Sequence, residues 1–288
     1  MDERELIERV GRLIGSEHVR DDCAVFTAGG ATLVASTDML HETTDFPAGM
    51  TDWQIGWMSA AVTLSDIAGM GARPLLLLLA TGLDRPERLM GITEGALACC
   101  EHYGATLAGG DTDAHSECTI VSTGIGVAEE GHVVRRRGSV PGDLICITGI
   151  PGCAQAGLSG YTEHRKALLE PQPGVREGPL LAKAGATAMM DVSDGLVISL
   201  YDLLKVNDCG YALRSDKIPE PAGVPPLEAL EMALYGGGDF GLLFTCPPDM
   251  MPVDGVEATV VGEVIAERKV LVDGEEVERR GYMHGWGG

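Results

Sequence analysis

The alternation of apolar and polar residues predicts helices and strands in turn along the first half of the chain. Apolar residues at helical spacing predict helices over residues 2–14, 51–70 and 86–103. Short runs rich in Val, Ile, Leu and Thr predict strands over residues 32–38, 75–82 and 119–128. Each of the first two strands is followed by a helix, so helices and strands are mixed from the start.

The same alternation returns after a change of character at Arg135–Asp143. Three arginines and a turn rich in Gly and Pro interrupt an otherwise acidic chain there. We expect a domain boundary at this point, which gives domains 1–137 and 138–288. The second half predicts strands over residues 144–148, 187–190, 211–214, 241–245, 258–264 and 269–273, and helices over residues 153–159, 177–185, 194–206 and 227–234. The pattern alone therefore indicates mixed α and β structure in both halves.

Composition supports a folded, acidic protein. A length of 288 residues favours two domains, and 45% hydrophobic residues are enough for packed cores, which excludes a disordered chain. The chain has 43 acidic and 21 basic residues, which gives a net charge of −22. This balance argues against nucleic acids or anionic membranes as partners, because both need a basic surface. The charge itself has two interpretations: solubility or salt adaptation, or carboxylates that bind cations.

Targeting and redox signals indicate a cytoplasmic protein. The N-terminal segment, residues 1–6, is charged and amphipathic, unlike a signal peptide, and the longest apolar run, around Leu75–Ala80, is too short to span a membrane. The eight cysteines include no C-x-x-C pair. We therefore interpret them as small buried residues in a reducing compartment.

The order of the aspartates is more informative than their number. Several of them end an apolar run beside Gly, Ser or Thr: Asp21, Asp22, Asp38, Asp66, Asp111, Asp113, Asp191 and Asp194. Carboxylates on apolar elements are costly unless they are paired or bind a metal. A single such residue is usually a turn or helix-capping residue. The recurrence of one pattern favours a site with several Mg²⁺ ions and a phosphate, because Mg²⁺ takes oxygen ligands and shares them with substrate phosphates.

Other well-known phosphate and hydrolase motifs are absent from the sequence. There is no Gly–Lys pair, which excludes a Walker-type loop, and no protein-kinase glycine loop or G-x-S-x-G motif. The segment His41–Asp45 resembles a zinc-protease motif only weakly, and we interpret it as a polar loop.

Most of the aspartates that end apolar runs lie in short segments that together form a recognisable series of sequence blocks. The blocks are Asp21–Val25, Ser36–Asp38, Leu64–Pro74, Gly109–Thr112, Arg136–Gly138, Pro141–Asp143, Thr148–Gly149, Asp191–Leu196, Gly236–Phe240 and Gly281–Tyr282. They resemble the signature blocks of the thiamine-monophosphate kinase family and occur in family order over most of the chain. This family lies in a superfamily with aminoimidazole ribonucleotide synthetase and selenophosphate synthetase.

The resemblance implies a two-domain α+β protein with an aminoimidazole ribonucleotide synthetase-like fold. Residues 1–137 would bind ATP and Mg²⁺ and pair in a homodimer, and residues 138–288 would form an α/β sandwich domain that completes the substrate site. The implied reaction phosphorylates thiamine monophosphate to thiamine diphosphate with ATP and several Mg²⁺ ions. Transfer would be direct and in line, with no nucleophile from the protein.

The resemblance also implies residue roles at matching positions. Metal ligands would be Asp22, Ser36, Thr37, Asp38, Asp66, Asp111, Asp191 and Asp194. Four of these, Asp38, Asp66, Asp111 and Asp194, would support the transition state through the metal. ATP would contact Tyr103, Gly110, Asp111, Arg136 and Ser193. The acceptor would contact Asp45, Gly238 and Tyr282.

Two departures from the family pattern fall in the acceptor half of this implied site. Asp45 stands where the family has a histidine, and Gly238 replaces the glutamate of a Gly-Gly-Glu-Asp block. Because thiamine is a cation, Asp45 would compensate in charge for the lost glutamate. Two alternatives therefore stay open: an enzyme of the same fold that acts on another phosphorylated metabolite, and a non-catalytic nucleotide-binding regulator.

Overall fold

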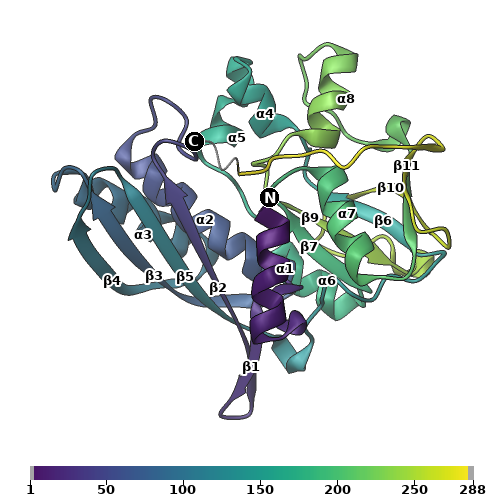
Figure 1. Ribbon diagram of the computed structural model, residues 1–288, viewed down its shortest axis with the longest axis horizontal. Helices are drawn as coiled ribbons and strands as arrows, with labels where there is room; N and C mark the ends of the chain where they lie inside the picture. The colour runs from purple at the N-terminus through teal and green to yellow at the C-terminus, as the bar shows by residue number, and fades with distance from the viewer. Residues whose placement is uncertain (1–2, 285–288) are drawn as a thin grey trace.

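The computed structural model describes residues 3–284 and contains two β-sheets side by side (Figure 1). The first sheet has five strands in the order β1-β2-β5-β3-β4. Their bounds are β1 (Ala24–Ala28), β2 (Ala31–His41), β3 (Arg73–Leu83), β4 (Thr106–Ala114) and β5 (Thr119–Val127). All neighbours pair antiparallel except β3 and β4, which are parallel. Helix α3 (Arg88–Tyr103) is the connection between those two strands.

Helix α2 (Asp52–Gly69) lies between the two sheets. It begins with a capping box in which Thr51 and Gln54 bind each other's backbone N–H groups. It is buried along almost its whole length, because it packs on β2 and β5 on one side and on β7 of the second sheet on another. A helix that is apolar all round is therefore what this position requires.

The second sheet has seven strands in the order β12-β11-β8-β10-β6-β9-β7. Its strands are β6 (Leu144–Thr148), β7 (Ala188–Val192), β8 (Gly210–Leu213), β9 (Gly241–Cys246), β10 (Ala258–Ile265), β11 (Val270–Val272) and β12 (Glu275–Glu276). The accompanying helices are α4 (Cys153–Leu158), α5 (Arg165–Leu169), α6 (Glu177–Ala184), α7 (Leu196–Val206) and α8 (Pro226–Tyr235). Short 3₁₀ helices cover Ser16–Val19, Glu129–Gly131, Thr162–His164, Ser215–Lys217 and Pro248–Met250.

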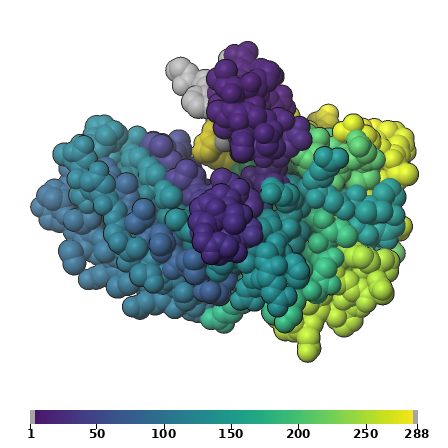
Figure 2. Space-filling model, turned by 90° about the horizontal axis from the view of Figure 1, so that it is seen from below, coloured from purple at the N-terminus to yellow at the C-terminus, as the bar shows by residue number. Residues whose placement is uncertain are grey.

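Helix α1 (Glu3–Ile14) lies on the surface where the two halves meet. Figure 2 shows its purple residues standing out from the rest of the molecule. The apolar side chains of Val10, Leu13 and Ile14 are exposed, whereas Gly11 is buried. The helix therefore contributes little to either hydrophobic core.

The predicted α+β fold is confirmed, and most elements lie within about two residues of their predicted bounds. Residue 2 of the predicted first helix lies outside the described residues. The sequence analysis missed β1, β4, α5 and β12. All eight cysteines are free thiols and seven of them are buried, as expected. Within residues 3–284, no helix combines the length and apolar character needed to cross a membrane.

Candidate active site

Four of the aspartates predicted as metal ligands lie close together at the junction of the two sheets. Asp22 precedes β1, Asp38 lies on β2, Asp66 on α2 and Asp191 on β7. The negative charges of the other three all raise the pKa of Asp66. We call these residues the carboxylate cluster. The fold thus gathers four acidic groups from segments that are far apart in sequence.

Hydroxyl groups hold three of these carboxylates. The donors are Ser36 to Asp66, Thr63 to Asp38 at 2.6 Å, and Ser65 to Asp191 at 2.7 Å. Two of the donors lie on α2, so this helix fixes carboxylates of both sheets. Ser65 was not singled out as a functional residue from the sequence, although it stands directly beside Asp66.

Asp22 differs because it is paired with an arginine. Its side chain is 0% exposed, and Oδ1 accepts a hydrogen bond from Arg136 Nε at 2.7 Å. Its other oxygen, Oδ2, is buried and has no hydrogen-bond partner of normal geometry in the described part of the chain. A Cβ at position 69 would lie 2.2 Å from this oxygen, so α2 must end in glycine there. An unsatisfied buried carboxylate oxygen is an unusual feature that a cation would satisfy.

Burial and mutual repulsion raise the pKa values of the carboxylates in the cluster. Burial, then the charges of Asp38, Asp191 and Asp22, raise the pKa of Asp66 well above its usual range. Burial and the charge of Asp22 raise the pKa of Asp191 to about 8. Groups in this situation gain stability from a proton or from a nearby cation. The cluster therefore has the electrostatics of a cation site.

The donor set fits Mg²⁺ that is shared with a phosphate, but not a closed metal cage. Among residues 3–284, no three His, Cys, Asp or Glu side chains form a ready-made metal-binding group. Mg²⁺ usually keeps several waters and is held by one or two carboxylates together with substrate phosphates. The unsatisfied oxygen of Asp22 and the repulsion among its neighbours suit that arrangement.

A cleft of about 590 Å³ opens beside the cluster and contains the predicted acceptor residues. Six predicted site residues line it: Asp38, Asp45, Ser193, Asp194, Gly238 and Tyr282. They come from both halves of the chain. Apolar and aromatic residues complete the wall, among them Phe46, Met58, Tyr235 and Phe240. The cleft therefore combines carboxylates with aromatic faces, a lining suited to an organic cation.

Backbone contacts hold the two loops on the far side of this cleft. Gly238 N donates to Ser193 O at 2.7 Å, and Tyr282 N donates to Asp194 O at 2.9 Å. Gly238 has a φ of +93°, a backbone conformation that side chains other than glycine rarely adopt. The local backbone therefore explains why a glutamate does not occupy this position here.

A second cavity, of about 640 Å³, lies under α1 on the other side of Asp194. Its lining includes the predicted ATP contacts Arg136 and Ser193 together with several further arginines. Arg4 of α1 binds Asp202 through two nitrogens and donates to Asp194 Oδ2 at 3.0 Å. Sequence analysis missed Arg4, because its partners lie 190 or more residues away.

Two predicted ligands lie on the opposite face of the first sheet. Thr37 is the neighbour of Asp38 on β2, so their side chains lie on opposite faces of the sheet. The Thr37 hydroxyl forms a hydrogen bond with Thr123 Oγ1 at 2.9 Å. Asp111 is exposed and shares the sheet row of Met39 and Ala80. Both side chains therefore face away from the carboxylate cluster of their own chain.

The two remaining predicted ATP contacts also lie apart from the cluster. Gly110 packs so closely on β3 that a Cβ would lie 1.8 Å from Leu79 O, which is a structural reason for glycine. Tyr103, at the end of α3, lines a third cavity of about 510 Å³ with His102 and Arg176. Its hydroxyl donates to Gln172 Oε1 at 3.3 Å.

Comparisons with known proteins agree with this geometry. Residues 20–128 match the family described as AIR synthase related protein, N-terminal domain. The chain is 54% identical to the thiamine-monophosphate kinase of Methanospirillum hungatei, over 99% of this chain and 100% of that one. It is 32% identical to that of Escherichia coli, over 96% and 94%. The solved structure of AaThiL complexed with AMPPCP and TMP superposes with a TM-score of 0.91 at 26% identity, over 99% and 97%.

Residues 20–128 thus match the N-terminal domain of the AIR synthase related class. Within that class, full-length identity at this level places the chain in one branch. The chain belongs to the thiamine-monophosphate kinase family. The resemblance seen in the sequence is confirmed.

Proposed function

We propose that the protein phosphorylates thiamine monophosphate to thiamine diphosphate with ATP. The observation that carries this proposal is the cleft lined by Asp38, Asp45 and Tyr282, because Asp38 belongs both to this cleft and to the carboxylate cluster. Family membership supports it, and so does the related AaThiL structure, which holds an ATP analogue and TMP together. The protein is therefore a phosphotransferase with a phosphate group as acceptor.

The carboxylate cluster would hold several Mg²⁺ ions. Asp22, Asp38, Asp66 and Asp191 supply the carboxylates, and Ser36 and Asp194 are further proposed ligands. Thr37 and Asp111 are also proposed Mg²⁺ ligands, but they lie on the other face of the sheet, so any Mg²⁺ that they bind would lie outside this cluster. Bound Mg²⁺ would neutralise the charge of the phosphates and of the transition state. We assign no nucleophile to the protein, because an oxygen of the acceptor phosphate forms the new bond to phosphorus while the bond to ADP breaks. The protein's task is to position the two phosphates in line.

A different set of residues would bind the nucleotide. Arg136 and Ser193 line the cavity under α1 and are proposed to contact the ATP phosphates. The planar guanidinium of Arg136 suits phosphate oxygens. Tyr103, Gly110 and Asp111 are the other proposed ATP contacts, but none of them lines this cavity: Tyr103 lines the third cavity, and Gly110 and Asp111 lie on β4.

The acceptor cleft suits the positive charge of thiamine. Asp45 and Asp194 supply negative charge, and Tyr282 and Gly238 form the opposite wall. Aromatic side chains in the same lining favour a cationic ring. Asp45 would therefore supply the negative charge that, in the family pattern, comes from a glutamate at the position of Gly238.

We also propose a homodimer that forms through the open face of the first sheet. Phe26, Met39 and Leu78 are exposed on this face, and Asp111 lies among them. A second copy packed there would bury these side chains and place Asp111 at the subunit boundary. Sedimentation velocity should give about twice the chain mass of 30.3 kDa, and Met39→Glu should halve it. Wild-type protein that sediments as one chain at micromolar concentration contradicts the dimer.

Three further expectations stay part of the proposal. They are the division into domains 1–137 and 138–288, a cytoplasmic location, and partners limited to small molecules and the second subunit, without nucleic acid or membrane. The net charge of −22 supports the last of these.

A ³¹P NMR experiment tests the proposed reaction. Protein with ATP, Mg²⁺ and thiamine monophosphate should give the diphosphate resonances of thiamine diphosphate together with ADP. Asp38→Asn should abolish both signals, because it removes a proposed metal ligand at the cleft wall. Wild-type protein that binds ATP but leaves thiamine monophosphate intact contradicts the proposal. Turnover of another phosphorylated metabolite would then identify a different acceptor, and no turnover at all would favour a regulator.

A further inference from the structure

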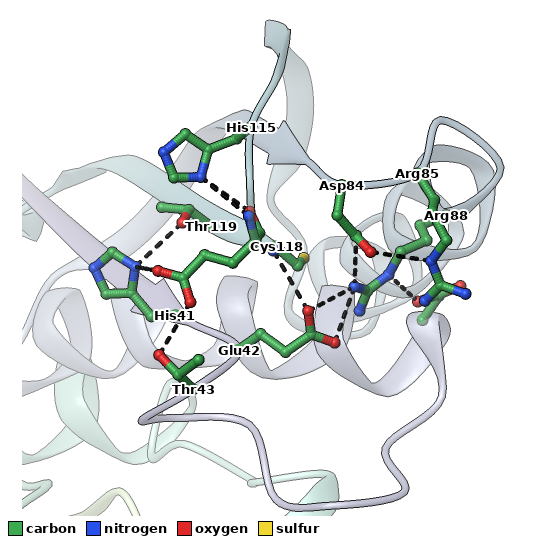
Figure 3. Close-up of polar contacts among 11 residues, drawn as sticks. His41, Glu42, Thr43, Asp84, Arg85, Arg88, His115, Cys118 and Thr119 are labelled. Carbon is green, nitrogen blue, oxygen red and sulfur yellow. Dashed lines mark hydrogen bonds and ion pairs between the residues drawn. The ribbon is translucent and has the colours of Figure 1, made fainter.

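A buried arginine outside the carboxylate cluster gathers three carboxylates around it (Figure 3). Arg88, the first residue of α3, has a side chain that is only 5% exposed. Its Nη1 donates to both carboxylate oxygens of Glu42 at 2.9 Å and to Asp84 Oδ1 at 3.0 Å, and its Nε donates to Asp52 Oδ1 at 2.8 Å. Burial alone would lower the pKa of Arg88, but these hydrogen bonds outweigh it and keep the side chain charged.

Two of the three carboxylates mark the two ends of a single loop, residues 42–51. Glu42 directly follows β2, and Asp52 is the first residue of α2. Between them, residues 44–47 form one wall of the acceptor cleft. Asp84 belongs instead to the turn that precedes α3, outside this loop. One guanidinium therefore joins the start and the end of the segment that carries Asp45.

Short-range hydrogen bonds connect Asp45 to the start of the loop, which Arg88 holds through Glu42. Asp45 Oδ2 accepts from His41 N at 2.8 Å, and Asp45 N donates to His41 O at 2.9 Å. The neighbouring Glu42 N donates to Cys118 O at 2.9 Å, which fixes the same point to the residue directly before β5. Asp45 is thus tied to the end of β2, and the end of β2 is tied to Arg88 through Glu42.

A ten-residue segment without helix or strand loses considerable conformational entropy when it takes one position. The Arg88 guanidinium is buried, whereas the carboxylates of Glu42 and Asp52 are 40% and 38% exposed. Hydrogen bonds between charged groups are stronger than those between neutral groups, and burial of the guanidinium limits competition from water on its side of each contact. The contacts of Arg88 act on both ends of the loop at once, so they restrict the loop without touching the ligand.

We propose that Arg88 is a positioning residue for the acceptor, because its contacts to Glu42 and Asp52 set the place of loop 42–51 and hence of Asp45 in the cleft. This inference rests on the proposed function, since it names the acceptor as the molecule in that cleft. It predicts that loosening the Glu42 contact weakens binding of the acceptor and not of ATP.

Glu42→Gln and Asp84→Asn form a matched pair that tests this role. Each removes one negative charge from Arg88 at nearly constant shape, but only Glu42 belongs to the loop. In Glu42→Gln an amide NH₂ replaces an oxygen that accepts from Arg88. We expect the KM for thiamine monophosphate to rise about five- to tenfold, or roughly 1 kcal/mol. The KM for ATP and kcat should stay within about twofold.

Asp84→Asn should leave all three kinetic constants within about twofold of wild type. Hydrogen exchange supplies a readout that does not depend on activity: amides of residues 42–51 should exchange faster in Glu42→Gln than in Asp84→Asn, with equal exchange elsewhere. Equal exchange of the loop in the two variants overturns the inference, as does an equal change in acceptor KM. Wild-type protein without turnover of thiamine monophosphate would instead reject the proposed function, and the exchange comparison would still decide the role of Arg88.

Discussion

Asp66→Asn is expected to lower the rate of thiamine monophosphate phosphorylation by at least about a thousandfold. Asp66 lies among Asp22, Asp38 and Asp191, so it is one of the carboxylates that would hold Mg²⁺ in the proposed site. Loss of a group that stabilises transition-state charge typically costs a factor of about 10²–10³, and a shared metal adds to this. Steady-state kinetics at saturating Mg²⁺ measures the effect. A loss of less than about tenfold would remove Asp66 from the metal site.

The same variant should be more stable than wild type when metal is absent. An uncharged side chain relieves the repulsion within the cluster, and Asn can still accept the hydrogen bond from Ser36. We expect a gain of about 1–2 kcal/mol at pH 7.5 with EDTA, measured by urea unfolding. Mg²⁺ should stabilise the wild type more than the variant. A metal-free variant that is less stable than wild type would show that repulsion is not the dominant energy here.

The pH dependence of the metal-free wild type follows from the same pKa values. The folded-state pKa of Asp191 is raised to about 8, and that of Asp66 is also raised, so the folded protein binds more protons than the unfolded chain above about pH 4. The stability that these groups contribute is present below their unfolded pKa and is lost as pH rises toward 8. Asp66→Asn should flatten this slope.

Arg136→Met is expected to destabilise the protein by about 3 kcal/mol, because it leaves a buried carboxylate without its counterion. The Asp22 side chain is fully buried, and Arg136 is the arginine that binds it. Burial raises the pKa of Asp22, so protonation of this carboxylate would recover part of the loss, and the effect should be smaller at pH 5 than at pH 7.5. Urea unfolding at pH 5 and pH 7.5 measures both effects.

The neighbouring arginine provides a matched control for this prediction. Arg135 also pairs with an aspartate, Asp21, but Arg135 is 46% exposed, and Asp21, which is 7% exposed, keeps a hydrogen bond from Arg136 N. Arg135→Met should therefore cost less than Arg136→Met, about 1 kcal/mol, because Asp21 retains a partner and water can reach the site of the lost guanidinium. Equal losses in the two variants would mean that burial of Asp22 does not set the energy of the pair.

Most elements of the fold could be predicted because their apolar spacing is strong and local. Helix α2 and strand β6 show this well, since an apolar helix and a Val/Ile-type strand are visible without any partner. The missed strand β1 is short and pairs with β2 across Gly29–Gly30. Two adjacent glycines with positive φ make a tight hairpin turn there, which is a signal that the strand pattern alone does not contain.

The candidate site, like the fold, could be predicted from the sequence only in part. The aspartates at the ends of apolar runs were recognisable one by one, and the fold brings Asp22, Asp38, Asp66 and Asp191 together. Arg4 and Arg88 were not recognisable, because an arginine at the start of a helix has no local pattern that names its distant carboxylates. Thr37 and Asp111 face the other side of the sheet, a consequence of strand pairing that motif matching does not reveal.

The segments at both ends of the described chain meet at Asp194. Arg4 binds its carboxylate, and the backbone of Tyr282 binds its carbonyl oxygen. A fluorescent label attached near either end would therefore lie within reach of the acceptor cleft and report its occupancy without disturbing either core. Conversely, trimming of either end by a protease would alter the site while leaving both sheets intact, so loss of activity in stored protein should precede loss of fold.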